Sequence, residues 1–306
     1  MTAEQLKKNL QTPKGKIDVV LDTDAYNEID DQYAISYMLK SPEKLNVKAI
    51  YAAPFYNENS VSPEDGMEKS YAEIIKLLEL TDNIAMRKNV YKGSRSYLKS
   101  EQIPSESEAA RHLCNLADTY TPERPLYIAA IGAITNIASA LLYNPGITDK
   151  IVIVWLGGHS REYGNNSEFN MMQDIAAARV VFASGAPVIQ LPCRGVVSAF
   201  SISKQELEYF LLGKNPLCDY LVKRTIEAMD RDTSCDVDRT RVIWDAAVIG
   251  WLLNDSGDFM ADRITDIRLP AYDNRYSNKR SGGIMTYVYS INRDKLMQNM
   301  IAKLTK

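Results

Sequence analysis

Short apolar segments alternate with segments of helical periodicity along most of this 306-residue chain. The apolar segments are of strand length and rich in β-branched residues, and they occupy residues 17–22, 46–53, 125–131, 151–156 and 187–191. The segments with helical spacing occupy residues 29–40, 64–80, 105–118, 134–143 and 174–184. Strands that alternate with helices form βαβ units and a mostly parallel sheet. We therefore predict an α/β fold in which helices flank a mostly parallel central sheet.

The rest of the chain extends this pattern without a visible boundary. Helices are expected over 203–230 and 245–254, and strands over 264–269 and 284–290. The polar stretch 279–283 is expected to be a surface loop. Because no repeat or linker divides the sequence, we predict a single domain over 1–306, with residues 1–16 as an N-terminal extension.

Composition argues against several classes of function. Lys and Arg total 36 and Asp and Glu total 39, a net charge of −3, so nothing draws the chain toward nucleic acid or an anionic membrane. No apolar run reaches the roughly 18–20 residues that span a bilayer. The N-terminal sequence lacks the apolar core of a signal peptide, and a cytoplasmic location is expected.

Cysteine and histidine are too scattered to favour the sites that they usually build. The four cysteines form no CxxC pair, so neither a zinc site nor a disulfide framework is favoured. The only histidines are His112 and His159. A Ser-His-Asp triad or a site with several histidine ligands is therefore not expected.

Five acidic residues fall within ten positions after the first predicted strand, at Asp22, Asp24, Glu28, Asp30 and Asp31. The carboxyl edge of a parallel sheet is where α/β proteins bind ligands. Crowded carboxylates repel each other unless they take up protons or a cation, and an all-oxygen set suits Ca²⁺ or Mg²⁺. A solvated acidic loop followed by a helix N-terminus is the alternative. An aspartyl-phosphate phosphatase motif is disfavoured because Tyr26 stands where Thr or Val is needed.

Three further polar segments follow predicted strands or precede a predicted helix. They are Gly-Ala-Ile-Thr-Asn-Ile-Ala at 132–138, Glu-Phe-Asn at 168–170 with Asp174, and Trp244-Asp245 before an apolar helix. Each could by itself be an ordinary helix cap or a core residue. Together with the first acidic cluster, they place carboxylates, an amide and an indole at one edge of the predicted sheet.

This ordered set of four segments resembles the inosine-uridine-preferring nucleoside hydrolase family. The first cluster is similar to the family's Asp-x-Asp-Pro-Gly-x-Asp-Asp, the 132–138 segment to its Gly-Pro-Leu-Thr-Asn-Ile-Ala, and Glu168-Phe169-Asn170 to its Glu-Phe-Asn. The resemblance covers residues 17–290 and implies hydrolysis of the N-glycosidic bond of ribonucleosides with a Ca²⁺ cofactor. It also implies a homodimer or homotetramer.

The resemblance assigns roles to individual residues. Asp24 would bind Ca²⁺ and act as the base toward its water, and Asp31, Asp245 and the backbone carbonyl of Thr135 would complete the metal site. The residues implied in substrate binding are Asp30, Asn165, Glu168, Asn170 and Trp244. Asp22 would lie behind the metal ligands and help to hold them in position.

Trp244 occupies the position where many family members carry a histidine acid, which resembles the purine-specific branch. An indole there would stack on the base and ease its departure, so we expect a preference for purines. A second aromatic residue would complete a sandwich, and the candidates are Phe55, Tyr56 and Tyr97.

The loop 25–29 is two residues longer than the family's, and it would bring Asn27 or Glu28 into the pocket if it bulges. Other segments expected on the base side also depart from the family's sequence. Hydrolysis of a modified nucleoside or another N-riboside is therefore an alternative. A non-catalytic nucleoside or ribose-binding protein on the same fold is a second alternative.

Overall fold

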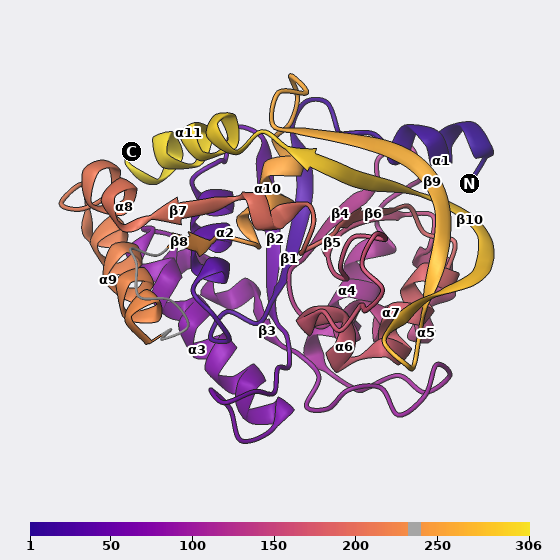
Figure 1. Cartoon of the computed structure of the whole chain (residues 1–306). Helices are drawn as coiled ribbons and strands as arrows, with labels where there is room; N and C mark the ends of the chain where they lie inside the picture. The colour runs from indigo at the N-terminus through magenta and orange to yellow at the C-terminus, as the bar shows by residue number, and fades with distance from the viewer. Residues whose placement is uncertain (232–239) are drawn as a thin grey trace.

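Eight strands form one central sheet in the order β3-β2-β1-β4-β5-β6-β10-β9, in a computed structural model that describes residues 1–231 and 240–306, with the backbone alone at 278–281 (Figure 1). The strands of this sheet are β1 (Ile17–Thr23), β2 (Leu45–Ala52), β3 (Val90–Lys92), β4 (Leu126–Ala130), β5 (Ile151–Leu156), β6 (Val188–Leu191), β9 (Met260–Ala271) and β10 (Arg275–Ile291). A small antiparallel pair is formed by β7 (Ser201–Ser203) and β8 (Thr240–Val242).

The α-helices are α1 (Ala3–Asn9), α2 (Asp30–Leu39), α3 (Pro63–Leu80), α4 (Glu108–Ala117), α5 (Thr135–Tyr143), α6 (Phe169–Gln173), α7 (Ile175–Ala183), α8 (Lys204–Phe210), α9 (Pro216–Arg231), α10 (Ala246–Leu252) and α11 (Arg293–Leu304). Short 3₁₀ turns lie at Ile84–Asn89, Pro145–Ile147 and Val197–Ala199. None of the described helices is both long enough and apolar enough to cross a bilayer.

The sheet is parallel except at one edge. Leu21 of β1 lies opposite Ile50 of β2 on one side and Ala129 of β4 on the other, both in parallel register. Strand β10 continues the parallel order beside β6, and β9 pairs with it antiparallel. The predicted α/β fold with a mostly parallel central sheet is confirmed.

Two hydrophobic cores cover the two faces of the sheet. Successive side chains of a strand point to opposite faces, so Val19 and Leu21 join the core beneath α2, α3 and α10, whereas Val20 joins the core beneath α4, α5 and α7. Figure 1 shows these two helical layers on either side of the strands. Strands buried on both faces are apolar throughout, as in Ile151–Leu156.

The order of the strands locates a ligand site. From β1 the chain runs outward through β2 and β3, and then returns to place β4, β5 and β6 on the other side of β1. The connections that leave β1 and β4 therefore diverge and open a crevice at the carboxyl edge. This crevice is where the acidic cluster after β1 lies.

The stretch expected to be helical over 203–230 consists of two helices, α8 and α9, which are separated because Gly213 has a φ of +73° and Pro216 begins a new helix. One expectation about a segment is wrong. The loop expected at 279–283 belongs to β10, whose backbone pairs with β9 at Arg280 and Arg268. Its polar composition carries no alternating apolar signal, so the sequence pattern did not indicate a strand there.

The N-terminal extension is partly helical. Thr2 caps α1, and the Thr286 hydroxyl of β10 donates a 2.5 Å hydrogen bond to the Leu10 carbonyl. Cys114, Cys193 and Cys218 are buried free thiols, and Cys235 lies outside the described residues.

Candidate active site

A cavity of about 260 Å³ opens at the carboxyl edge of the sheet beside β1 and β4. Its lining comes from the segments after β1, β4, β5 and β6 and from the residues before α10, so five parts of the chain converge on it. The lining residues are Asp24, Asn27, Glu28, Asp30, Ile131, Leu156, His159, Ser167, Glu168, Phe169, Asn170, Cys193, Arg194, Trp244 and Asp245.

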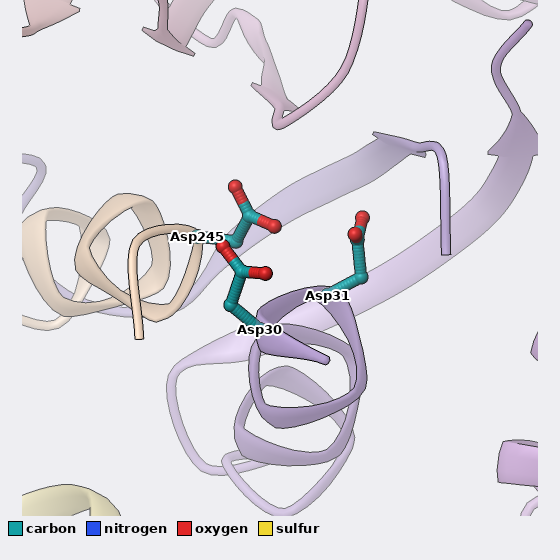
Figure 2. Close-up of side chains that lie close together, drawn as sticks. All are labelled: Asp30, Asp31 and Asp245. Carbon is teal, nitrogen blue, oxygen red and sulfur yellow. The ribbon is translucent and has the colours of Figure 1, made fainter. Parts of the chain in front are cut away.

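Three aspartates cluster at this pocket, and two of them, Asp30 and Asp245, line it. Oxygens of Asp30, Asp31 and Asp245 all lie within 4.8 Å of one another, and all three residues are buried (Figure 2). Asp30 and Asp31 open α2, where the helix dipole favours carboxylates. Asp245 precedes α10 without capping it through its side chain, so its carboxylate is available to the pocket.

Asp24 lies against the same group. Burial raises the pKa of its carboxyl well above its usual range, and the nearby charges of Asp31 and Asp30 raise it further. Gly132, after β4, comes so close that a Cβ there would lie 3.0 Å from Asp24 Oδ1. Within the described part of the chain, Asp24 Oδ2 and Asp30 Oδ1 are buried without a hydrogen-bond partner.

This donor set fits a hard divalent cation. Burial raises the pKa of Asp31 and Asp245 strongly, and the other carboxylates raise both further. Four buried carboxylates, two of them with an unpartnered oxygen, are destabilised when ionised, and a divalent cation removes that repulsion. Asp30, which was expected to bind ribose, belongs to the three aspartates whose oxygens lie within 4.8 Å of one another. Asp24, which was expected as a metal ligand, does not belong to that group.

Two residues expected near the metal serve the surrounding loops. Thr135 begins α5, and its hydroxyl donates a 2.7 Å hydrogen bond to Asp174, which in turn caps α7. Asp22 is fully buried behind the pocket and accepts a 2.8 Å hydrogen bond from Asn136 Nδ2. Burial raises the pKa of Asp22 to about 7.

Glu168 and Asn170 also line the pocket. Glu168 caps α6, and its carboxylate accepts backbone hydrogen bonds from Gly158, Asn170 and Met171 at 2.8–3.0 Å. The Asn170 amide donates to the carbonyls of Ile131 and Leu156, at 3.1 and 3.0 Å. It thereby ties the ends of β4 and β5 together.

Asn165 is exposed and accepts a hydrogen bond from its near neighbour Ser167, so the structure does not bring it into the pocket. The buried residue is Asn166, which accepts a 2.6 Å hydrogen bond from the His159 backbone.

Trp244 lines the pocket next to Asp245 and packs on the core. The three aromatic residues considered as its partner, Phe55, Tyr56 and Tyr97, are not among the described lining residues, whereas Phe169 is. From the longer loop 25–29, both Asn27 and Glu28 line the pocket, and Glu28 pairs with Arg241.

Sequence reasoning missed His159, Cys193 and Arg194 as pocket residues. They follow β5 and β6, whose carboxyl ends lie at the same edge as the aspartates. Their location after two parallel strands was the feature of the sequence that could have identified them, because they belong to no motif.

Comparisons with known proteins agree with this architecture. The pyrimidine-specific ribonucleoside hydrolase RihA of Escherichia coli O1:K1 is 28% identical over 220 residues, which are 65% of this chain and 67% of the relative. A plant nucleoside hydrolase superposes with a TM-score of 0.77 at 19% identity, covering 96% of this chain and 99% of the other. The purine-preferring ribonucleoside hydrolase from Gardnerella vaginalis gives a TM-score of 0.73 at 19% identity, covering 94% and 98%.

The sequence model of the family described as inosine-uridine preferring nucleoside hydrolase matches residues 19–281. That match spans most of the chain and includes every segment that forms the pocket. The chain therefore belongs to the inosine-uridine preferring nucleoside hydrolase family and is a ribonucleoside N-glycosyl hydrolase.

Proposed function

We propose that the protein hydrolyses ribonucleosides to free base and ribose with a Ca²⁺ cofactor, with Asp24 as general base and with a preference for purines. The observation that carries this proposal is the convergence of Asp24, Asp30, Asp31 and Asp245, buried and partly unpartnered, on one pocket. Asp24, Asp31, Asp245 and the Thr135 carbonyl would hold the ion. All of these are oxygen donors, which Ca²⁺ prefers.

Asp24 would take a proton from the attacking water. The water oxygen forms a bond to C1′ of the ribose while the bond from C1′ to the base nitrogen breaks, and that electron pair leaves with the base, which gains a proton. A bound divalent cation would lower the pKa of the water. Asp24 suits the role of base because it lines the pocket and its Oδ2 has no hydrogen-bond partner among the described residues.

The remaining carboxylates would act on the sugar. Positive charge develops on the ribosyl ring as the bond breaks, and the negative charge of Asp30 and Asp245 stabilises it. Asp30 has a free buried oxygen with which to accept a hydrogen bond from a ribose hydroxyl. Glu168 and Asn170 line the same pocket, where they would bind the ribose hydroxyls.

Trp244 supports the preference for purines. It lines the pocket beside Asp245 and offers an indole face to a flat base. A pyrimidine preference is the second candidate, because the relative RihA is named pyrimidine-specific. The homo-oligomer and the cytoplasmic location implied by the family resemblance stay predictions.

A panel of inosine, guanosine, adenosine, cytidine and uridine tests this proposal, with release of free ribose as the readout. We expect release with Ca²⁺, loss of release after chelation, and higher kcat/KM for the three purine nucleosides. Higher kcat/KM for cytidine and uridine would reverse the base preference. No release from any of the five with calcium present would overturn the claim for standard nucleosides.

A further inference from the structure

One wall of the pocket carries two polar side chains to which the proposed chemistry gives no role. His159 follows β5 and Arg194 follows β6, and both line the cavity. The two loops are joined by backbone hydrogen bonds, from Cys193 to the Gly158 carbonyl at 2.8 Å and from Ser160 to the Arg194 carbonyl at 2.9 Å. His159 and Arg194 therefore belong to one continuous wall.

The backbone at His159 is held in place by hydrogen bonds on both sides. The His159 backbone donates to Asn166 at 2.6 Å, and its carbonyl accepts a 3.0 Å hydrogen bond from the Tyr276 hydroxyl of β10. Tyr276 is fixed in turn by Gln190 of β6, at 2.7 Å. Gly158 makes this contact possible, since a Cβ there would lie 2.3 Å from the Tyr276 oxygen.

Both side chains carry hydrogen-bonding groups that have no partner among the described residues. His159 is only 8% exposed, and its Nδ1 is buried with no partner among the residues described. Arg194 is exposed at the mouth of the pocket and is the one cation among the described lining residues, and no ion pair or side-chain hydrogen bond engages it in that part of the chain. A guanidinium next to an imidazole with an unused nitrogen is suited to a phosphate group.

The neighbouring acid is already engaged. Glu168 accepts three backbone hydrogen bonds, and the Cys193 thiol also bonds to it. These donors offset part of its negative charge, so a second anion next to Arg194 is less strongly repelled. A free hydroxyl of the substrate would need only Glu168 as a hydrogen-bond partner. His159 and Arg194 would then have no function.

The shape of a riboside indicates which substituent reaches this wall. With the 2′- and 3′-hydroxyls at the aspartates and the base at Trp244, as in the proposed function on which this inference rests, the remaining exocyclic substituent is at C5′. We propose that the His159–Arg194 wall binds a phosphate at C5′, so that ribonucleoside 5′-monophosphates are substrates of this pocket. Water adds its hydroxyl to C1′, the bond from C1′ to the base breaks, the base leaves with a proton, and ribose 5-phosphate is the second product.

Binding of the product tests this without catalysis. Isothermal titration calorimetry would compare ribose 5-phosphate with ribose, in the calcium-loaded and in the calcium-free protein. We expect ribose 5-phosphate to bind about tenfold more tightly or better, the increment of a charged hydrogen bond. Arg194→Met should abolish the difference, Arg194→Lys should keep part of it, and His159→Gln should reduce it. The matched control is Arg124→Met, an exposed arginine outside the pocket, which should leave it unchanged.

Turnover separates this inference from the proposed function. We expect kcat/KM to be higher for UMP and IMP than for uridine and inosine, and Arg194→Met to lower the ratio of UMP to uridine about tenfold. Turnover of nucleosides with no gain from the phosphate, or equal loss for both substrates in Arg194→Met, would overturn the inference and leave the proposed function intact. No base release from any phosphorylated or unphosphorylated riboside would overturn both. A preference for uridine 5′-carboxylate over UMP would also contradict a phosphate site.

Discussion

Asp30 and Asp245 lie far apart in the sequence, but both line the pocket and their carboxylate oxygens lie within 4.8 Å of each other. One opens α2 and the other precedes α10, and both helices pack on the same core (Figures 1 and 2). Burial raises the pKa of both carboxyl groups, and a divalent cation between them would relieve the repulsion of their ionised forms. The pair comes together because α10 packs beside α2.

Asp24→Asn should remove the general base while keeping the pocket's shape. We expect kcat to fall about 10²- to 10⁴-fold, the usual contribution of a positioned proton acceptor. Ribose release gives kcat, and circular dichroism checks that the variant is folded. Asp258→Asn, an exposed aspartate away from the pocket, is the control and should match the wild type. An Asp24→Asn enzyme with near wild-type kcat would assign the base to another group.

Trp244→Ala should change the preference between purine and pyrimidine bases more than it changes the binding of the ribose. Stacking on an aromatic side chain contributes about 1–3 kcal/mol per base, and a purine offers the larger face, so kcat/KM for inosine should fall about tenfold. The loss for uridine should be smaller, and Trp244→Phe should retain part of the inosine rate. Equal losses for the two nucleosides would exclude stacking as the source of the preference.

Asp22 should make the stability of the metal-free protein depend on pH. Burial raises its pKa from 3.8 to about 7 in the folded state, whereas the unfolded chain has the ordinary value. Between these two values the folded state binds more protons, so this residue's contribution to stability is present below about pH 3.8 and is lost as pH rises through about 7.

The Asp22→Asn variant has no such titration and can keep a carbonyl oxygen toward Asn136. Its melting temperature relative to the wild type should therefore increase as pH is raised across that window, with calcium removed. Asp258→Asn should show no trend. A difference that stays constant or declines with pH would mean that Asp22 is ionised in the folded protein throughout.

Asn136 should be a structural residue of the site. Its Oδ1 accepts from the Ser94 backbone at 2.8 Å, and its Nδ2 donates to Asp22 at 2.8 Å. Asn136→Ala leaves these buried groups without a partner, which costs about 1–3 kcal/mol for each unsatisfied group. Urea denaturation would measure the free energy of unfolding. Asn144→Ala, at an exposed hydrogen bond to Asp118, is the control, and equal effects of the two changes would exclude the proposed role.

The sequence was most informative where residues are buried on both faces of the sheet or cluster by charge. The strand expected over 151–156 is β5 to the residue, because burial on both faces requires an unbroken apolar run. Asp31 and Asp245 were expected to lie together, and their oxygens lie within 4.8 Å of each other, because α10 packs beside α2, which begins with Asp30 and Asp31.

Loops and exposed elements were harder to predict because tertiary contacts decide them. Asn166 rather than Asn165 is buried, because the register of that loop depends on its bond to the His159 backbone. His159 and Arg194 carry no motif and reach the pocket only through the pairing of two loops. Helix α11 and the long exposed hairpin of β9 and β10 have weak apolar patterns, so their extent was not predicted.

The most direct measurement is a crystal structure of the protein grown with Ca²⁺, with anomalous scattering used to locate the ion. We predict one peak between Asp24, Asp31 and Asp245, with carboxylate oxygens at about 2.3–2.6 Å. No peak at saturating calcium, or a peak that these three side chains do not touch, would contradict the account of this pocket as a metal-dependent hydrolase site.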